Sequence, residues 1–296
     1  MLRRKEKLSY HKLPPQLKTK ILMASYPIAL TIAGSDSGGC AGIQADLKTF
    51  SALGVFGASV ITAITAQNTM GVYDVMAVPS DIVRKQLKAV LDDFNIGAIK
   101  VGMLFTKENV LVLKELYNKK IPLVLDPVMI STSGNSLILD QTIEAIKQEL
   151  FPLATIITPN LNEASILLGR EIISTDDMIE GGKEFIESYG LNAVLIKGGH
   201  LNGDEMVDIF YSKDSQEPIM LKSKKIETKN THGTGCTLSS AIAAYLSIGN
   251  NLEDSVRMAK DYITRAIFEA KDISLGNGHG AVNHFFDPKK LIIRWK

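Results

Sequence analysis

Short apolar segments alternate with longer amphipathic segments along most of the chain. The apolar segments have the length and β-branched composition of buried strands at Ile28–Ala33, Ala58–Ala66, Ala98–Leu104, Leu123–Met129, Thr155–Thr158 and Ala193–Lys197. Helices are predicted at Ile43–Ala52, at Asp81–Phe94 and over most of the chain from Gly235 onward, with a pair of strands at Asp208–Ser212 and Ile219–Ile226. This alternation predicts an α/β fold, in which a central, mostly parallel sheet carries helices on both faces.

The first 22 residues differ in composition from the rest of the chain. They carry seven Lys or Arg residues and one acidic residue, although the whole chain has a formal net charge of only +1. The segment lacks the apolar core of a secretory signal. We interpret residues 1–22 as a flexible basic extension, followed by one domain at 23–296. An organelle presequence is a weaker explanation because the segment has only one Ser, and a nucleic-acid tail is weaker because no basic or aromatic residues continue it.

The overall composition bounds the compartment and the partners. The near-neutral charge gives no argument for nucleic-acid binding, and no apolar run approaches the roughly 18 residues of a membrane helix. Cys40 and Cys236 form no CxxC motif, so a structural zinc site lacks its usual closely spaced set of four ligands. We expect reduced thiols, a cytoplasmic location, and neither nucleic-acid nor membrane partners.

Four candidate site residues stand where predicted strands end. They are Met103, Asp126, Asn160 and Lys197. In open α/β sheets, ligands bind outside the carboxyl ends of the strands. One such residue alone would merely begin a loop, but four of them with two glycine-rich turns indicate a ligand site.

The first glycine-rich turn reads AGSDSGGCAGIQADLKTF and includes Gly34. Its glycines do not fit the G-x-G-x-x-G spacing, and no P-loop Lys follows them. As plain structure it is a strand-to-helix turn capped by Ser and Asp. As a functional element it is a backbone cradle for a small polar ligand at a helix N-terminus.

A second motif, PNLNEA, places Asn160 and Glu163 three residues apart after Pro159. At the start of a helix both lie on one face, where they can form a helix cap. The alternative is a magnesium site in which water and phosphate oxygens supply most ligands. Asp126, which precedes Pro127, is a candidate second acidic group for the metal.

The second glycine-rich turn reads THGTGCTL and precedes an apolar helix. Backbone N–H groups and the helix dipole at Gly233, Thr234 and Gly235 suit an anion such as a phosphoryl group. We expect the position of Cys236 in the first helical turn to lower its thiol pKa, although a buried inert cysteine is the usual alternative. A cysteine hydrolase leaves the magnesium motif unexplained, whereas phosphoryl transfer accounts for both motifs.

With these motifs the chain resembles the ribokinase-like superfamily. Within it, the chain is most similar to the hydroxymethylpyrimidine and phosphomethylpyrimidine kinases of thiamine biosynthesis. The resemblance runs from about Ala29 to Phe286 and includes VITAITAQNTMGV, KVGML, LIKGGH and GHGAVNHF besides the motifs above. It implies that ATP and Mg²⁺ phosphorylate 4-amino-5-hydroxymethyl-2-methylpyrimidine and then its monophosphate.

The resemblance also implies roles for individual residues. Cys236 matches the catalytic base, and Gly233, Thr234 and Gly235 match the anion hole. Gln67 and Asp46 match the residues that read the pyrimidine, Met103 lines that pocket, Asn160 and Glu163 match the motif for magnesium and phosphate, and Lys197 lies near the ATP phosphates. Apart from the resemblance, we expect Gly34 of the first turn to bind the substrate and Asp126 to bind the metal with Glu163. A Gln amide has a donor and an acceptor, so it can pair with an aminopyrimidine in two places.

Two positions depart from the family pattern. Cys40 stands where the loop usually has Gly, and its side chain could crowd the substrate. Ala281 stands where Pro is usual, with little expected effect.

Three further expectations stay open on the sequence. A pyridoxal kinase of the same fold is the nearest alternative, against which Gln67 argues. A non-catalytic ligand-binding module is the second alternative. The resemblance suggests a homodimer, in which the strands around 208–226 could form the edge.

Overall fold

A computed structural model describes residues 24–129, 139–199, 205–215 and 217–295. The extension predicted at 1–22 lies outside these residues. None of the described helices combines the length and the apolar character that a membrane crossing requires.

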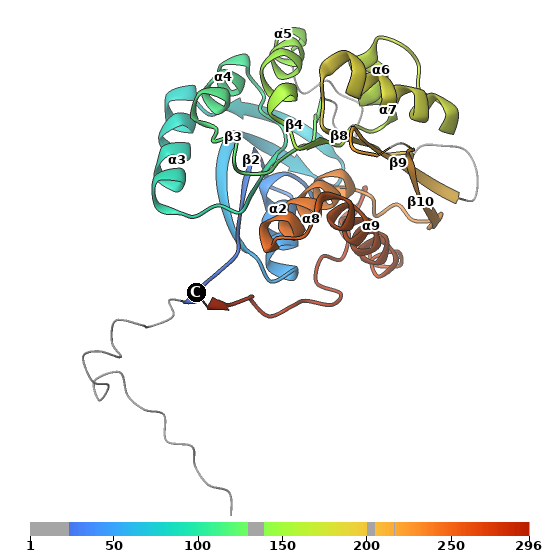
Figure 1. The fold of residues 1–296 in the computed structure, drawn as a ribbon. Coiled ribbons are helices and arrows are strands. Elements are labelled where there is room, and N and C mark those ends of the chain that lie inside the picture. The colour runs from blue at the N-terminus through green and yellow to red at the C-terminus, as the bar shows by residue number, and fades with distance from the viewer. Residues whose placement is uncertain (1–23, 130–138, 200–204, 216, 296) are drawn as a thin grey trace, which may run out of the picture.

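A nine-stranded sheet forms the centre of the described chain (Figure 1). Its strands are β2 (Ile28–Asp36), β3 (Phe56–Asn68), β4 (Gly71–Ala77), β5 (Ala98–Val101), β6 (Leu123–Leu125), β7 (Ile156–Ile157), β8 (Ala193–Ile196), β9 (Glu205–Ser212) and β10 (Ile219–Lys224). Their order is β10-β9-β8-β7-β6-β5-β2-β3-β4. Neighbours from β8 to β3 are parallel, whereas β4, β9 and β10 are antiparallel to their neighbours. The predicted, mostly parallel sheet is confirmed.

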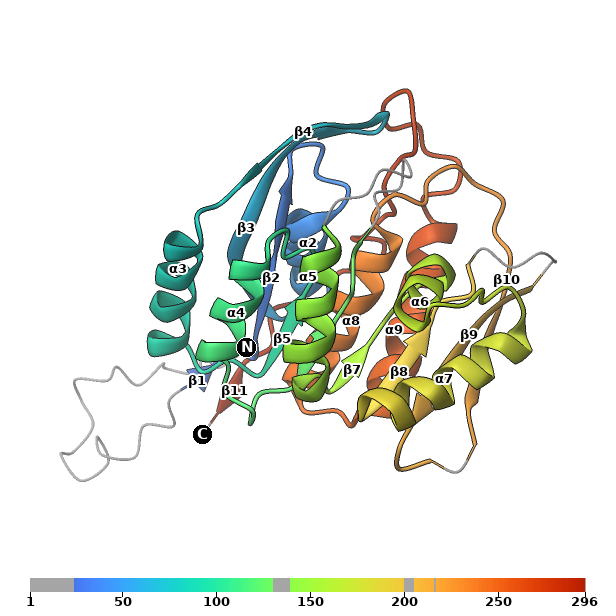
Figure 2. The ribbon, with the colours of Figure 1, turned by 90° about the horizontal axis from the view of Figure 1, so that it is seen from above.

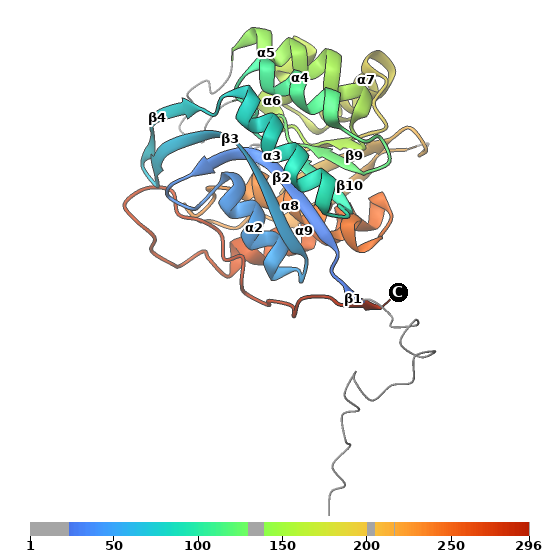
Figure 3. The same ribbon diagram turned by 90° about the vertical axis from the view of Figure 1, so that its left-hand side faces the viewer.

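Helices cover both faces of the sheet, as Figure 3 shows. They are α2 (Gly42–Ala52), α3 (Ser80–Asp93), α4 (Lys107–Leu116), α5 (Asp140–Ala145) with its continuations η2 (Ile146–Leu150) and η3 (Phe151–Leu153), α6 (Leu161–Leu168), α7 (Thr175–Tyr189), α8 (Thr234–Ile248) and α9 (Leu252–Phe268). α2, α8 and α9 pack on one face, and α3 to α7 on the other. Each face therefore has its own apolar core.

Helix α8 lies between the sheet and α9 (Figure 2), and this position explains its composition. Its residues from Thr237 to Ala244 are all buried. A helix that is covered on several sides is apolar almost all round, whereas α9 buries a stripe that includes Val256, Ala259 and Ile263. Buried packing fixes the axis of α8 and thereby fixes the place of the THGTGC turn at its N-terminus.

The end of the chain differs from the prediction. Helical structure continues only to Phe268 within the described residues, and the segment after it returns along the site. There the Gly280 carbonyl accepts a hydrogen bond from the His232 amide, and the His279 amide donates to the Thr69 carbonyl. The chain then ends in β11 (Arg294–Trp295), which pairs with β1 (Ala24–Ser25).

Candidate active site

The predicted strand-end residues follow neighbouring strands of the sheet. Met103, Asp126, Asn160 and Lys197 come after β5, β6, β7 and β8, which are adjacent in that order. Asn160 and Lys197 also form a parallel bridge beyond the last two strands. Parallel strands end at the same edge, so the fold gathers these four residues at one rim of the sheet.

The two glycine-rich turns meet at this rim, backbone against backbone. The Asp36 carboxylate shapes the first turn by accepting hydrogen bonds from the amides of Gly38, Cys40 and Ala41 at 2.8, 2.9 and 2.7 Å. Gly233 in the second turn has φ +81°, and a Cβ there would lie 1.8 Å from the Cys40 carbonyl oxygen. Only glycine satisfies both the left-handed backbone and this contact.

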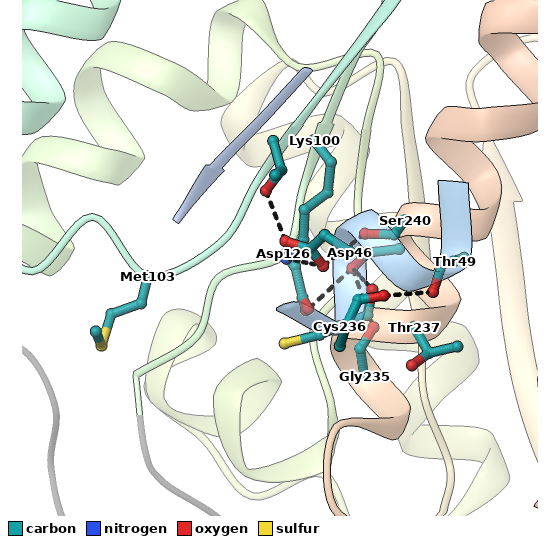
Figure 4. A network of polar contacts seen from close by, with 12 residues as sticks. Asp46, Thr49, Lys100, Met103, Asp126, Gly235, Cys236, Thr237 and Ser240 are labelled. Atoms are coloured by element: carbon teal, nitrogen blue, oxygen red, sulfur yellow. Dashed lines mark hydrogen bonds and ion pairs between the residues drawn. The ribbon is translucent and has the colours of Figure 1, made fainter. Parts of the chain in front are cut away.

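Cys236 lies in the first turn of α8, and its thiol accepts a hydrogen bond from the Gly42 amide at the start of α2. No side chain caps either helix N-terminus. In Figure 4 its sulfur points toward the side on which Met103 lies. The thiol therefore sits where backbone N–H groups from two helices converge.

The electrostatics of Cys236 differ from the prediction. Burial raises the pKa of the thiol to about 11. The negative charges of Asp46 and Asp126 also raise it, whereas the nearby Lys100 ammonium lowers it. The expected lowering of the thiol pKa is therefore wrong for the ligand-free protein. Desolvation disfavours a charged sulfur more strongly than the surrounding cation and amides favour it.

Asp46 lies on the side of Cys236 that faces Lys100, in the protein interior (Figure 4). Its two carboxylate oxygens accept hydrogen bonds from Thr31 at 2.6 Å, Ser240 at 2.6 Å and Lys100 at 2.9 Å, and the residue is fully buried. With its oxygens engaged, it has no free acceptor for a pyrimidine in this arrangement. In this geometry Asp46 instead pairs with the buried Lys100 ammonium, which lies close to the Cys236 thiol.

The charge of Lys100 is stabilised by its neighbours. Burial alone would lower the pKa of this ammonium, but Asp46, Cys236 and Asp126 together raise it above its ordinary value. A buried Lys is stable as a cation only when a paired carboxylate offsets its desolvation. Lys100 is therefore a fixed positive charge close to Cys236.

A second ionic cluster, formed by Asp126, Lys197 and Glu163, lies below the Gly235 turn. Lys197 Nζ is 2.9 Å from Asp126 Oδ1 and 4.0 Å from Glu163 Oε2, and a Cβ at Gly235 would lie 3.1 Å from the same nitrogen. Burial alone would raise the pKa of Asp126, but the nearby Lys197 and Lys100 ammonium groups lower it below its ordinary value. For Glu163 burial prevails and raises the pKa to about 7. Lys197 is thus paired mainly with the Asp126 carboxylate and only weakly with Glu163.

Asn160 and Glu163 form a capping box at the start of α6. The Asn160 side chain accepts from the Glu163 amide at 2.9 Å, and the Glu163 carboxylate accepts from the Asn160 amide at 2.8 Å. The structural interpretation of this motif is therefore correct. It does not exclude the magnesium interpretation, because the same box fixes a carboxylate beside Lys197.

Gln67, Gly34 and Met103 lie on the other side of the first turn. A Cβ at Gly34 would lie 2.5 Å from Met103 Cε, so this methionine packs directly on the glycine. Gln67 is half-buried at the end of β3, and its Nε2 is 2.8 Å from Nε2 of His232. The structure therefore packs Met103 on Gly34 and joins Gln67 to the second turn through His232, whereas Asp46 is engaged in the buried ionic contact with Lys100.

Several residues at the site were missed in the sequence analysis. Lys100 could have been noticed as a charged residue inside the apolar strand AIKV. Ser239 and Ser240 bond Asp126 and Asp46 at 3.1 and 2.6 Å, but two serines inside an apolar helix give no distinct signal.

Solved structures show which class of protein has this fold. The chain resembles the crystal structure of pyridoxal kinase from Bacillus subtilis in an ADP complex, with a TM-score of 0.79, 38% identity, and coverage of 88% of this chain and 98% of that one. It also resembles phosphomethylpyrimidine kinase from Clostridium difficile 630, with a TM-score of 0.70, 47% identity, and coverage of 81% and 99%. Fold and site together define a kinase of the ribokinase-like class.

Sequence comparison identifies the family within this class. The phosphomethylpyrimidine kinase family model matches residues 36–283. The hydroxymethylpyrimidine/phosphomethylpyrimidine kinase of Rhizobium meliloti is 49% identical over 261 residues, which cover 87% of this chain and 97% of the relative. The chain belongs to the hydroxymethylpyrimidine/phosphomethylpyrimidine kinase family, and the enzyme class predicted from its motifs is confirmed.

Proposed function

We propose that the chain transfers a phosphoryl group from ATP to the hydroxymethyl oxygen of 4-amino-5-hydroxymethyl-2-methylpyrimidine, and then to the monophosphate so formed. The product pyrophosphate serves thiamine biosynthesis. The placement of Cys236 carries this proposal, because its thiol meets the amides of two helix N-termini, and the turn that precedes it contacts Gln67 through His232. The chain shares its family with relatives named for both phosphorylation steps.

Cys236 accepts the proton of the substrate hydroxyl in the proposed reaction. The hydroxyl oxygen attacks the γ-phosphorus of ATP, the bond to the leaving ADP oxygen breaks, and the proton passes to the sulfur. The amides at Gly233, Thr234 and Gly235 stabilise charge on the transferred group. Lys100 offsets the negative charge of the thiolate, and Lys197, whose ammonium lies next to Gly235, contacts the ATP phosphates in this proposal.

The residues present fit a magnesium ion that is bound mainly through ATP and water. Asp126 already accepts bonds from Lys197, Thr158 and Ser239, and Glu163 belongs to the capping box, so neither offers a bare carboxylate for direct ligation. Mg²⁺ usually keeps several waters, which such engaged carboxylates can accept. When bound, the ion neutralises phosphate charge; Glu163, whose pKa is about 7, becomes charged more readily beside it.

Gln67 favours the pyrimidine over pyridoxal as the substrate. Pyridoxal kinases are structural neighbours with higher TM-scores than the Clostridium difficile relative, which keeps pyridoxal as a second candidate. Gln67 offers the paired donor and acceptor that an aminopyrimidine edge requires. A site built for such bonds rejects analogues that leave its polar groups unpaired.

An ADP-release assay with ATP and Mg²⁺ tests the assignment. Hydroxymethylpyrimidine, its monophosphate and pyridoxal are compared side by side, with wild type and Gln67→Met. We expect turnover of both pyrimidines, and a KM for the pyrimidine that rises at least tenfold in Gln67→Met while the KM for ATP is unchanged. Turnover of pyridoxal alone, or an unchanged pyrimidine KM in the variant, would contradict the assignment.

The enzyme is further proposed to be a cytoplasmic homodimer that associates along the β4 edge. Both cysteines are free thiols in the described chain, in keeping with a reducing compartment. The β4 side of the sheet exposes Ile64, Tyr73 and Met76 by 45%, 68% and 61%, whereas β10 exposes Met220 beside the charged Lys222. Lysine protects edge strands from pairing, so β4 is the better candidate than the strands around 208–226. Light scattering on Tyr73→Glu should show a monomer; an unchanged mass would exclude this edge.

A further inference from the structure

Three metal-ligating side chains converge where the first glycine-rich turn meets the second. A carboxylate oxygen of Asp36, the Cys40 sulfur and a His232 ring nitrogen all lie within 4.8 Å of one another. All three residues are at least nine-tenths buried, with exposed fractions of 3%, 1% and 7%. The phosphoryl-transfer steps described above use none of these side chains.

The donor set selects a particular kind of metal. A thiolate, an imidazole and a carboxylate suit Zn²⁺ and similar borderline ions, whereas Mg²⁺ prefers oxygen ligands alone. In a tetrahedral zinc site neighbouring ligand atoms lie about 3.5 Å apart, as follows from Zn–N and Zn–S distances near 2.1 and 2.3 Å. His232 Nε2 is 3.8 Å from Asp36 Oδ2, so small side-chain shifts would close the site.

The ligands are held in place by their own hydrogen bonds. The Gly38 amide donates to Asp36 Oδ1 and the Cys40 and Ala41 amides donate to Oδ2, so a metal bound to Asp36 would share or displace one of these hydrogen bonds. The Gly280 carbonyl accepts from the His232 amide at 3.1 Å. Such outer contacts orient metal ligands in protein sites. The Cys40 sulfur lies 3.6 Å from the Gly38 carbonyl oxygen, a long contact that gives up little when a metal takes its place.

His232 Nε2 lies between Gln67 and the cluster, 2.8 Å from Gln67 Nε2 and 3.8 Å from Asp36 Oδ2. Gln67 Nε2 can only donate, and it lies 2.8 Å from His232 Nε2, so that ring nitrogen is the acceptor. A metal at Nε2 would therefore compete directly with Gln67.

We propose that Asp36, Cys40 and His232 form a zinc site, and that zinc inhibits the kinase by taking His232 from Gln67. The inhibition rests on the proposed role of Gln67 in binding the pyrimidine. On binding, the Cys40 thiol releases its proton to water as the Zn–S bond forms, and a Zn–N bond replaces the Gln67 hydrogen bond. Water completes the coordination, and no oxidation state changes.

Cobalt titration of the whole protein tests the site without any activity. Co²⁺ bound by a thiolate gives a charge-transfer absorption in the near ultraviolet, and zinc should then displace it. We expect about one equivalent to bind the wild type and Cys236→Ala alike, and the absorption to vanish in both Cys40→Ala and Cys40→Ser, because neither variant keeps the sulfur ligand. Absorption that survives in Cys40→Ala, or that is lost in Cys236→Ala, would place the metal elsewhere and overturn the proposal.

Zinc inhibition tests the consequence for catalysis. With zinc buffered by a chelator and ATP saturated with Mg²⁺, we expect the KM for the pyrimidine to rise severalfold while the KM for ATP stays constant. Cys40→Ala should lose the inhibition, which is measured for each protein relative to its own zinc-free rate. Equal inhibition of both proteins would refute the mechanism, and a protein inactive toward pyrimidines would refute the proposed function while leaving the cobalt result to decide the site.

Discussion

The raised pKa of Cys236 makes the pH dependence of the reaction a direct test of its role as base. With a pKa of about 11, roughly one thiol in 10⁴ is ionised at pH 7, which corresponds to about 5 kcal/mol. If the thiolate takes the substrate proton, kcat/KM for the pyrimidine should rise about tenfold per pH unit from pH 7 to 9.5. The negative charge of bound ATP would move the thiol pKa further up and preserve this slope.

Substitutions of Cys236 separate this explanation from other ionisations. Cys236→Ala should lose at least a hundredfold in kcat while binding of the pyrimidine, followed by calorimetry, is retained. Cys236→Asp carries a carboxyl group that ordinarily titrates near 4, so its activity should be nearly independent of pH above 8. A wild-type plateau at or below pH 8, or the same slope in Cys236→Asp, would refute the reasoning.

Three further predictions concern the packing and the charges around the thiol. Gly233→Ala should destabilise the protein by well over the 1–2 kcal/mol of left-handed strain alone, because its Cβ meets the Cys40 carbonyl. Gly190→Ala is the matched control, with φ +63° and no atom within 4 Å, and equal losses of unfolding free energy in urea would contradict the contact argument. Lys100→Met should cost about 3–5 kcal/mol by leaving Asp46 buried and unpaired, and Asp46→Leu added to it should recover part of this loss; urea midpoints that fall further in the double variant would contradict the pairing. Because the pKa of Glu163 is raised from 4.5 to about 7, its ionisation lowers the free energy of unfolding by up to about 3 kcal/mol as pH rises through that interval. Glu163→Gln should abolish this loss between unfolding measurements at pH 4.5 and 7.5. An unchanged pH dependence in the variant would count against the assignment to Glu163.

Much of the fold could be predicted because parallel strands are buried on both faces and therefore read as continuous apolar runs. Strand β5 is buried throughout and begins at Ala98 as predicted, but it ends at Val101 rather than at Leu104. Strand β4, by contrast, was missed because the sequence GVYDVMA at the edge of the sheet has a mixed burial pattern. Strand β6 ends at Leu125, earlier than predicted, because Asp126 precedes a proline and continues the chain as a loop.

The site was predictable where residue type and strand ends coincide, and less so where burial decides the chemistry. Asp126 and Lys197 follow from their place after adjacent strands. Neither the pairing of Asp46 with Lys100 nor the raised pKa of Cys236 could be deduced, because both depend on which side chains three elements press together. A motif shows that a cysteine starts a helix, but not how little water reaches it.

The contact between the Cys40 carbonyl and Gly233 has a consequence for how the two turns can change over evolutionary time. The constraint on position 40 falls on its main chain, which every amino acid shares, whereas the constraint on position 233 excludes any side chain. Position 40 can therefore carry a side chain, which in this chain is a thiol buried at 1% exposure. Position 233 cannot carry a side chain, so a functional side chain at this contact can come only from the first turn.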